Sequence, residues 1–237
     1  MRKVVSVLLC VSLLLIFGCG DSKKADAPVK KISTPKEWSA TGVFQLKPPP
    51  KGADIAVIHT TMGDIKIRFF ETEAPKAVKN FASLTKSGYF VDNIFFKVVK
   101  DGYILTGDRT GSGDDGQSSY IIPFEDEFSP KLQAYRGAVM MSHVGSRGNL
   151  SQFLIVQSKT VSATHLEDMK TLKYPQEVQD TYASLGGMPL LDHQTTVFGQ
   201  VIEGMDVVDK IGAVPTDEKE KPKTPIKIIS VEMTKMP

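Results

Sequence analysis

Short apolar runs separated by glycine, proline and aspartate constrain the fold of this chain more than any other feature. Six of them lie at residues 95–99, 103–106, 138–143, 153–157, 197–202 and 226–233. Runs of this length, bounded by turn residues, are typical of β-strands, because a helix needs a longer segment with apolar residues every three to four positions. The chain is therefore expected to build a β framework from many short strands.

The segment ahead of these runs predicts a β-hairpin followed by a helix. Ile55, Val57 and His59 occupy alternate positions, as do Ile65, Ile67 and Phe69, with turn residues between the two stretches. From Pro75 to about residue 88 the apolar residues follow helical spacing, and proline suits a first helical turn. A second helix is expected over residues 205–211. These elements predict a mainly β fold, a closed antiparallel eight-stranded barrel capped by two helices.

Residues 159–189 interrupt the β pattern and are expected to form a partly helical insertion. Helical spacing runs from Gln176 to Leu185 and ends at Gly186-Gly187, residues that suit a helix terminus. The chain has 237 residues, of which 41% are hydrophobic, and this suits one core better than two. We therefore assign residues 53–237 to a single domain that carries the insertion.

The N-terminus has the features of a secretory signal. Arg2 and Lys3 precede an uncharged, largely apolar run over residues 4–17. A helix needs about 20 residues to cross a bilayer core, so this shorter run does not predict a permanent transmembrane span. The segment instead predicts export from the cytoplasm.

Ile16-Phe17-Gly18-Cys19 resembles the lipobox of bacterial lipoproteins, in which the cysteine receives lipid and becomes the first residue of the mature chain. We therefore expect residues 1–18 to be removed as a signal peptide and Cys19 to be lipidated. The protein would be extracytoplasmic and membrane-anchored, on the periplasmic side or at the cell surface. The alternative is a signal peptide cut elsewhere, in which Cys10 and Cys19 are ordinary residues.

Residues 19–52 are expected to be a flexible tether between the lipid and the domain. The segment is rich in Lys, Ala, Ser and Pro, ends in Pro48-Pro49-Pro50, and has no sustained apolar period. Such a composition cannot bury enough apolar surface to fold, and its proline-rich end favours an extended, semi-stiff chain. Residues 42–46, with Trp38 nearby, leave open a short strand packed on the domain.

Charge and cysteine content exclude several classes of function. The chain carries 29 basic and 27 acidic residues, and removal of Arg2 and Lys3 would leave 27 of each. A neutral protein without a dense basic stripe has little charge with which to neutralise phosphates, so no nucleic-acid partner is expected. With Cys10 removed and Cys19 lipidated, no thiol remains for a disulfide or a zinc site.

No cofactor and no metal are expected. The stretch Gly111-Ser112-Gly113-Asp114-Asp115-Gly116 matches the dinucleotide-binding string, but no helical pattern follows it, and two carboxylates would repel a pyrophosphate. It is interpreted as a flexible surface loop. His59, His165 and His193 lack a spacing that would join them at one metal ion.

Several blocks follow one another along the globular part: Gly63-Asp64-Ile65, residues 74–81, Gly88-Tyr89-Phe90, residues 94–108, residues 125–128, Arg136-Gly137, Met141-Ser142-His143, residues 149–155 and residues 196–205. In this order they resemble the cyclophilin-type peptidyl-prolyl cis-trans isomerases, over about residues 53–236. The segment 186–192 is similar to that of a bacterial subgroup with an insertion at this place. The resemblance therefore implies a cyclophilin-like barrel.

The resemblance also implies an activity, which is rotation of Xaa-Pro peptide bonds. Amide resonance opposes this rotation with a barrier of about 18–20 kcal/mol, and crossing it needs neither a nucleophile nor a metal. In the family an arginine donates a hydrogen bond to the imide nitrogen, and other residues hold the peptide and the proline ring. The matching position implies that Lys97 is catalytic. The substrate-binding residues implied are Phe96, Tyr103, Leu105, Met141, Ser142, His143, Gln152, Leu154, Leu191 and Thr195.

Gln152 and Leu191 are retained from the family's site, whereas other positions differ. Besides lysine for arginine at Lys97, the replacements are Phe96 for histidine, Leu105 for glutamine, His143 for asparagine, Leu154 for phenylalanine and Thr195 for histidine. An ammonium is a flexible point charge, whereas a guanidinium is a rigid fork that a neighbouring side chain can hold. If each lost transition-state contact costs ~1.4 kcal/mol, each lowers the rate about tenfold.

The sequence leaves two functions open. One is an isomerase that assists folding of exported proteins by rotating their Xaa-Pro bonds. The other is a chaperone or assembly module of the same fold that binds proline-containing peptides with little or no catalysis. Both predict unfolded exported proteins as partners, and a membrane contact through lipid on Cys19. A solute-binding lipoprotein is disfavoured, because it needs a longer chain of alternating strands and helices.

Three residues also keep a simpler interpretation. None of these interpretations needs a functional site: Lys97 can be a solvated strand lysine, His143 a surface histidine, and Gln152 a polar residue that points outward.

Overall fold

The computed structural model describes residues 42–145 and 148–237. The chain divides into two units, Met1–Lys30 and Lys31–Pro237, and every described residue belongs to the second. The predicted signal peptide (residues 1–18), the lipidation site Cys19 and the greater part of the predicted tether lie outside the described residues. Among the described helices, none is long and apolar enough to cross a membrane.

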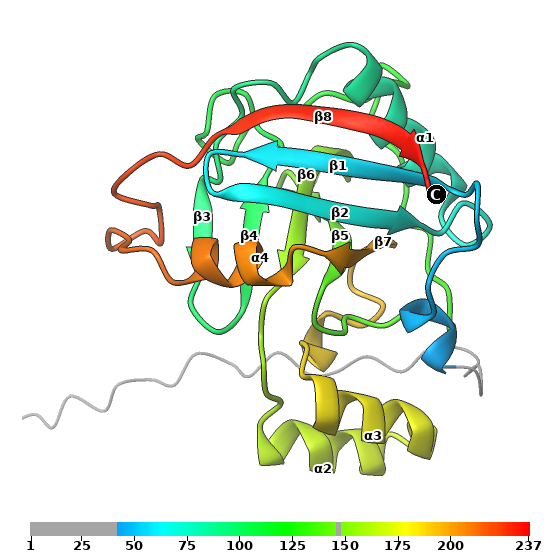
Figure 1. Ribbon diagram of the computed structural model, residues 1–237. Helices are drawn as coiled ribbons and strands as arrows, with labels where there is room; N and C mark the ends of the chain where they lie inside the picture. Colours follow the sequence, from blue (N-terminus) through cyan, green and yellow to red (C-terminus); the bar gives the residue numbers. More distant parts are fainter. Residues whose placement is uncertain (1–41, 146–147) are drawn as a thin grey trace, which may run out of the picture. The chain divides into compact units, whose positions relative to one another are not determined.

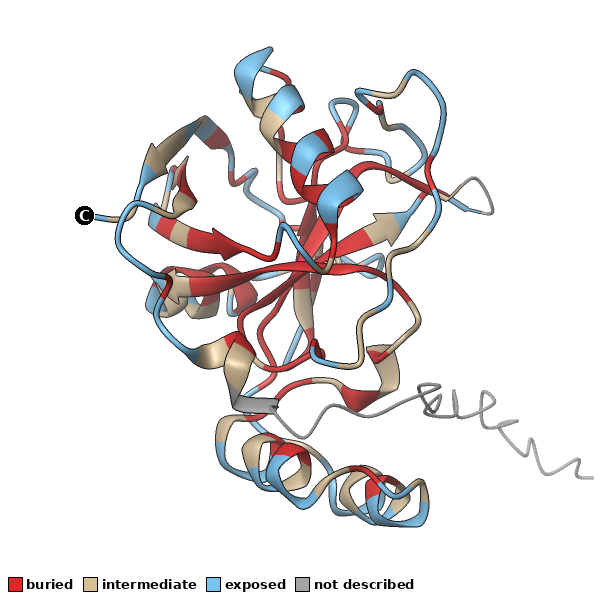
Figure 2. Cartoon of the chain, turned by 90° about the vertical axis from the view of Figure 1, so that its right-hand side faces the viewer, coloured by how far each residue is buried: buried red, intermediate tan, exposed pale blue. Residues whose placement is uncertain are grey.

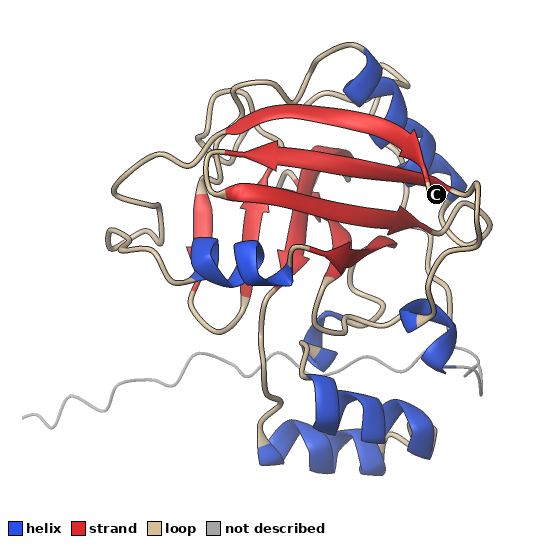
Figure 3. Ribbon diagram, viewed as in Figure 1, coloured by secondary structure: helices blue, strands red, loops and turns tan. Residues whose placement is uncertain are grey.

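Eight antiparallel strands form one curled sheet (Figures 1 and 3). They are β1 (Asp54–Thr60), β2 (Gly63–Phe69), β3 (Lys97–Val99), β4 (Tyr103–Thr106), β5 (Ala138–His143), β6 (Asn149–Val156), β7 (Val197–Glu203) and β8 (Ile228–Lys235). Their order is β3-β4-β6-β5-β7-β2-β1-β8. The mainly β architecture with eight antiparallel strands is therefore confirmed.

The two edge strands, β3 and β8, approach each other through the residues just ahead of them. Ile94 and Lys227 form an isolated antiparallel bridge. The backbone N–H of Phe95 donates to the carbonyl of Ile226 at 3.0 Å, and that of Asp92 donates to Ile228 at 2.9 Å. The sheet is thus a half-barrel whose edges meet at this short bridge and not along a full ladder.

Two helices cap the inner face of the sheet, as the apolar spacing predicts. Helix α1 (Pro75–Lys86) has proline in its first turn and buries Ala77, Val78, Phe81 and Leu84. Helix α4 (Met205–Gly212) buries Val207, Val208 and Ile211. These side chains join the inner cluster, which we define as the buried apolar residues between the sheet and the two helices.

Aromatic rings occupy the centre of the inner cluster. The Phe81 ring stacks on Phe90 with centroids 5.0 Å apart and meets the edge of Phe153 at 5.5 Å. Full burial of such a side chain contributes about 1.5–3 kcal/mol relative to exposure. Figure 2 shows the buried positions concentrated along the strands. The fold therefore depends on this cluster, and residues of a site on the other face can differ without loss of the fold.

The outer cluster lies on the opposite face of the sheet, because successive strand residues point to opposite sides. Its buried members are Phe70, Phe96, Leu105, Leu132, Ala134, Ala138, Met140, Leu154, Val156 and Val197. Met140 belongs to this cluster, whereas its neighbour Met141 belongs to the inner cluster. The outer cluster is the apolar floor beside which the candidate site is built.

The insertion forms a pair of helices, α2 (Ala163–Thr171) and α3 (Gln176–Leu185), followed by a short 3-10 turn, η2 (Pro189–Leu191). A third apolar cluster joins the pair to the sheet through Tyr135, Met169, Tyr174, Val178 and Tyr182. In Figure 1 the two helices lie beside each other, apart from the strands. The partly helical insertion predicted from the sequence is confirmed.

The segment just before the domain corrects the predicted tether of residues 19–52. Gly42–Leu46 form a 3-10 helix, η1, and Gln45 is fully buried. The Gln45 amide donates to Gln133 O at 2.9 Å and to Gln200 Oε1 at 3.0 Å, while its Oε1 accepts from Gln133 N at 2.8 Å. Amino-acid composition cannot reveal that a glutamine will be buried with its polar atoms paired. The segment packs on the domain, as the alternative predicts, but it is a 3-10 helix and not a strand.

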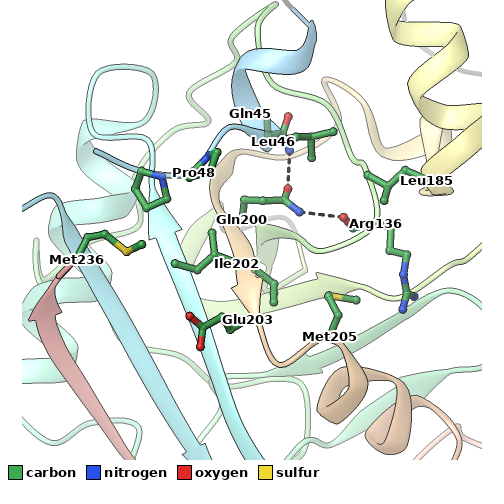
Figure 4. A pocket seen from close by; sticks show the side chains of 12 residues that line it. Gln45, Leu46, Pro48, Arg136, Leu185, Gln200, Ile202, Glu203, Met205 and Met236 are labelled. Carbon is green, nitrogen blue, oxygen red and sulfur yellow. Dashed lines mark hydrogen bonds between the residues drawn. The ribbon is translucent and has the colours of Figure 1, made fainter. Parts of the chain in front are cut away.

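A pocket of about 380 Å³ lies where η1 meets β7 and α4 (Figure 4). The Gln45–Gln200 hydrogen bond crosses one side of it, and the Gln200 amide donates to Arg136 O at 2.9 Å. None of the predicted site residues lines this pocket. It is separate from the candidate active site.

Candidate active site

A cleft of about 610 Å³ collects six of the predicted site residues. They are Phe96, Lys97, Leu105, Ser142, His143 and Gln152. Two loops that the sequence did not assign to a site complete the lining, one through residues 111–114 and the other through Asp217, Lys219 and Lys221. The cleft therefore has a floor of strand residues and walls made from loops distant in the chain.

One row of cross-strand neighbours explains why distant residues share this face. Lys97 of β3 pairs with Leu105 of β4, Leu105 pairs with Leu154 of β6, and Leu154 pairs with Met140 of β5. Residues directly opposite each other in antiparallel strands project to the same side of the sheet. The row places the lysine at the end of an apolar strip, an arrangement in which a cation can reach a bound apolar ring.

Lys97 is held by an acidic residue from a distant loop. Its Nζ lies 3.1 Å from Glu220 Oε2, and its side chain is 38% exposed. The hydrogen bond to Glu220 raises the pKa of Lys97 above its ordinary value, against the opposing effect of burial, so the ammonium is charged at neutral pH. Sequence reasoning missed Glu220, because no local motif links it to β3.

Asp108 organises the loop that forms one wall of the cleft. Its fully buried carboxylate accepts hydrogen bonds from the backbone N–H groups of Thr110 at 2.7 Å, Gly113 at 2.7 Å and Asp115 at 3.3 Å. Burial raises the pKa of Asp108, but its hydrogen bonds outweigh burial and hold the pKa below its usual range. The stretch interpreted as a flexible surface loop is instead tied to a buried carboxylate, which is a correction.

Gln152 is tied to the same wall. Its amide Nε2 donates to Gly113 O at 2.9 Å and to Asp115 O at 2.7 Å, and the residue is only 2% exposed. The interpretation of an outward-pointing, solvated glutamine is therefore wrong. Within residues 42–145 and 148–237, no group donates to its Oε1, so this oxygen can accept an N–H from a peptide in the cleft.

His143 lies at the margin of the cleft, where β5 ends. Its Nε2 is 2.9 Å from Asp126 Oδ2, and Asp126 Oδ1 also accepts from Asn149 Nδ2 at 3.0 Å and Thr196 Oγ1 at 3.1 Å. This network holds the ring and leaves the backbone of the Ser142-His143 segment at the cleft. The histidine is exposed but not free.

The other predicted site residues have different places. Leu154 is a buried member of the outer cluster, and Tyr103 and Leu191 pack against it, so they support the cleft from beside it. Thr195 donates from its hydroxyl to the carbonyl of Met141 at 2.6 Å. Met141 belongs to the inner cluster, so its side chain lies on the face of the sheet opposite the outer cluster, and it does not line the cleft. Its neighbour Met140 lies on the outer-cluster face but is itself fully buried.

The charges in the cleft are mixed. Besides the Lys97–Glu220 pair, the lining includes Lys219 and Lys221 against Asp114 and Asp217. Among the described residues no group of three His, Cys, Asp or Glu side chains is placed to hold a metal ion. The arrangement brings the Lys97 ammonium and the Gln152 amide together with the apolar side chains of Phe96 and Leu105, groups that a proline-containing peptide segment can contact.

Comparisons with known proteins agree with this geometry. The family model described as "Cyclophilin type peptidyl-prolyl cis-trans isomerase/CLD" matches residues 55–233. A Staphylococcus saprophyticus protein named "Putative peptidyl-prolyl cis-trans isomerase" is 38% identical over 194 residues, which cover 81% of this chain and 98% of the relative. A Staphylococcus aureus protein of the same name is 38% identical over 177 residues, which cover 75% and 90%.

A solved structure is similar as well. The cyclophilin-type peptidyl-prolyl cis-trans isomerase of Cryptosporidium parvum, crystallised in the presence of the dipeptide Ala-Pro, superposes with a TM-score of 0.61 and 30% identity, covering 76% of this chain and 98% of that one. The sequence match spans nearly the whole described domain, and the fold agrees with it. The chain belongs to the cyclophilin-type peptidyl-prolyl cis-trans isomerase family.

Proposed function

We propose that the cleft rotates Xaa-Pro peptide bonds in segments of exported proteins. The observation that carries this proposal is the meeting of Lys97 and Gln152 above one apolar floor in a single cleft. These are the two kinds of group that the reaction requires, a donor for the imide nitrogen and a polar contact for the peptide backbone. The dipeptide Ala-Pro present with the Cryptosporidium parvum relative is consistent with this substrate class.

Lys97 supplies the transition-state contact. As the Xaa-Pro bond twists, the imide nitrogen loses conjugation and its lone pair becomes able to accept a hydrogen bond. The Lys97 ammonium has three N–H donors, of which one is directed at Glu220, so two remain for a substrate. Such a bond is stronger in the twisted state than in the planar one, and this difference is what lowers the barrier.

A binding module is the second candidate, because leucines stand at two positions where the family's site has a glutamine and a phenylalanine. Leu105 and Leu154 are each only 6% exposed and are cross-strand neighbours. They have neither an aromatic face for a proline ring nor a polar atom that could orient Lys97. A cleft of this kind can bind proline-containing peptides and yet stabilise the twisted bond weakly.

Exchange measurements separate the two candidates. Cis-trans exchange in a panel of Xaa-Pro peptides is followed by NMR with the purified full-length protein, Lys97→Ala and the control Lys100→Ala, which removes an exposed lysine in the next turn. Catalysis through Lys97 predicts that Lys97→Ala loses about tenfold in rate, one transition-state contact, while Lys100→Ala matches the wild type. Peptide binding with no exchange enhancement in the wild type would establish the binding module instead.

We also propose that the protein acts outside the cytoplasm, held to a membrane by lipid on Cys19. The support is the charged start, the short apolar run and the Gly18-Cys19 pair of the sequence. Unfolded exported proteins are then the clients that the cleft meets. Cys19→Ser should release the protein from the membrane fraction, and continued membrane attachment of this variant would contradict the anchor.

A further inference from the structure

We propose that Glu220 is the positioning residue for Lys97, replacing the polar cross-strand neighbour that this site lacks. The inference rests on the proposed function and adds a residue to it. Lys97 lies directly opposite Leu105 in the β3–β4 ladder, and leucine offers no acceptor to hold an ammonium. The contact that could orient the lysine must therefore come from another element.

Glu220 makes that contact from the loop between α4 and β8. Its Oε2 lies 3.1 Å from Lys97 Nζ, and the two side chains are 44% and 38% exposed. Its carbonyl oxygen accepts a hydrogen bond from Val98 N at 2.8 Å, next to Lys97 in the chain. The backbone of Glu220 therefore binds Val98 and its side chain binds Lys97. Both contacts are with β3, so the carboxylate is fixed relative to the lysine.

The loop that presents Glu220 is itself held in place. Thr216 and Pro222 form an antiparallel bridge, and Glu220 N donates to Asp217 O at 3.1 Å. Lys221 Nζ reaches across the cleft to Gly111 O at 3.1 Å. Glu220 has a φ of 63°, in the left-handed region that is uncommon for non-glycine residues.

The charge of the carboxylate matters as well as its place. A free lysine side chain samples many rotamers, and a catalytic donor must be held near one direction to act on a twisting bond. Glu220 restricts that search and also favours the charged ammonium. The pair is partly exposed, so its effect is screened, and removing it should cost a few-fold in rate and not several orders of magnitude.

The test compares Glu220→Gln with the control Glu218→Gln, an exposed residue two positions away in the same loop. Glu220→Gln keeps the size of the side chain and the backbone bond to Val98. Peptide exchange by NMR gives kcat and KM on the purified full-length protein, and the ¹³Cε resonance of Lys97, followed against pH, reports its protonation. Circular dichroism verifies that both variants are folded.

We expect Glu220→Gln to lower kcat about two- to fivefold with little change in KM, and to shift the Lys97 titration to lower pH, while Glu218→Gln changes neither. If the wild type is active and Glu220→Gln has an unchanged or higher kcat, the role of Glu220 is overturned, while the proposed function stands. An unshifted Lys97 titration would overturn that role too. A wild type without any exchange would overturn the proposed function, and the catalytic role of Glu220 with it.

Discussion

Asp192 carries a wholly buried carboxyl where the insertion meets the sheet, and its ionisation should control stability. Its Oδ1 accepts from Ala134 N at 2.7 Å and from the Tyr182 hydroxyl at 2.6 Å, and its Oδ2 accepts from the Tyr174 hydroxyl at 3.2 Å. Burial raises the pKa of Asp192 from 3.8 to about 7, although these hydrogen bonds oppose the rise. Asp192→Asn has nearly the same shape and removes the titration.

The size of the effect follows from the shift in pKa. A carboxyl whose pKa is higher in the folded protein binds its proton more tightly there. The stabilisation that this bound proton gives the folded protein is complete below the unfolded pKa of about 4, and it is lost as the pH rises through about 7. At about 1.4 kcal/mol for each pKa unit, Asp192 alone should remove about 4 kcal/mol from the free energy of unfolding over this window.

Urea unfolding of the wild type and Asp192→Asn, at pH values from about 5 to about 8, measures this loss. Between those limits the wild type should lose about 2–3 kcal/mol more than the variant. Asp180→Asn, at an exposed position of α3, is the control and should follow the wild type. A constant difference between wild type and Asp192→Asn would refute the reasoning, since the tyrosine hydroxyls would then outweigh burial and keep the carboxylate ionised.

Three further predictions concern the site and the scaffold. Lys97→Arg should raise kcat in the exchange assay about tenfold, because a rigid fork can pair and donate together; an unchanged rate would contradict this. Gly107→Ala should lower the free energy of unfolding by several kcal/mol more than Gly52→Ala. Both glycines have a positive φ, but of the two only Gly107 would place a Cβ 2.3 Å from a backbone oxygen. Gln45→Ala should cost about 1–3 kcal/mol in urea unfolding by leaving buried partners unpaired, and a smaller loss would mean that η1 does not belong to the folded unit.

The fold could be predicted from the sequence wherever one face of an element is buried and the other is not. Apolar and charged residues alternate over residues 65–69, which form part of β2, and α1 begins at Pro75 as its spacing predicts. β6 differs: it begins at Asn149, four residues before the predicted strand, and all eight of its residues are buried. A strand covered on both faces loses the alternation on which the prediction depends.

The site was less predictable, because positional matching carries no information on which face a side chain takes. Position in the matched blocks predicts Met141 in the substrate site, whereas strand parity places its side chain in the inner cluster, on the face opposite the outer cluster. The contact between Lys97 and Glu220 joins residues far apart in the chain, and Asp108 orders a loop whose composition is typical of a mobile one. These are tertiary contacts between loops, and no local period encodes them.

The replacements in the cleft are best explained together. Leu105 and Leu154 are cross-strand neighbours, so leucine at both positions places two aliphatic side chains next to each other in the outer cluster, and Leu105 lines the cleft. Leucine cannot orient a cation, and Glu220 from a loop supplies the missing acceptor. Binding then depends on the sheet, and catalysis depends on the loop. Removing the Glu220 carboxylate should therefore lower turnover while leaving peptide affinity and stability close to those of the wild type.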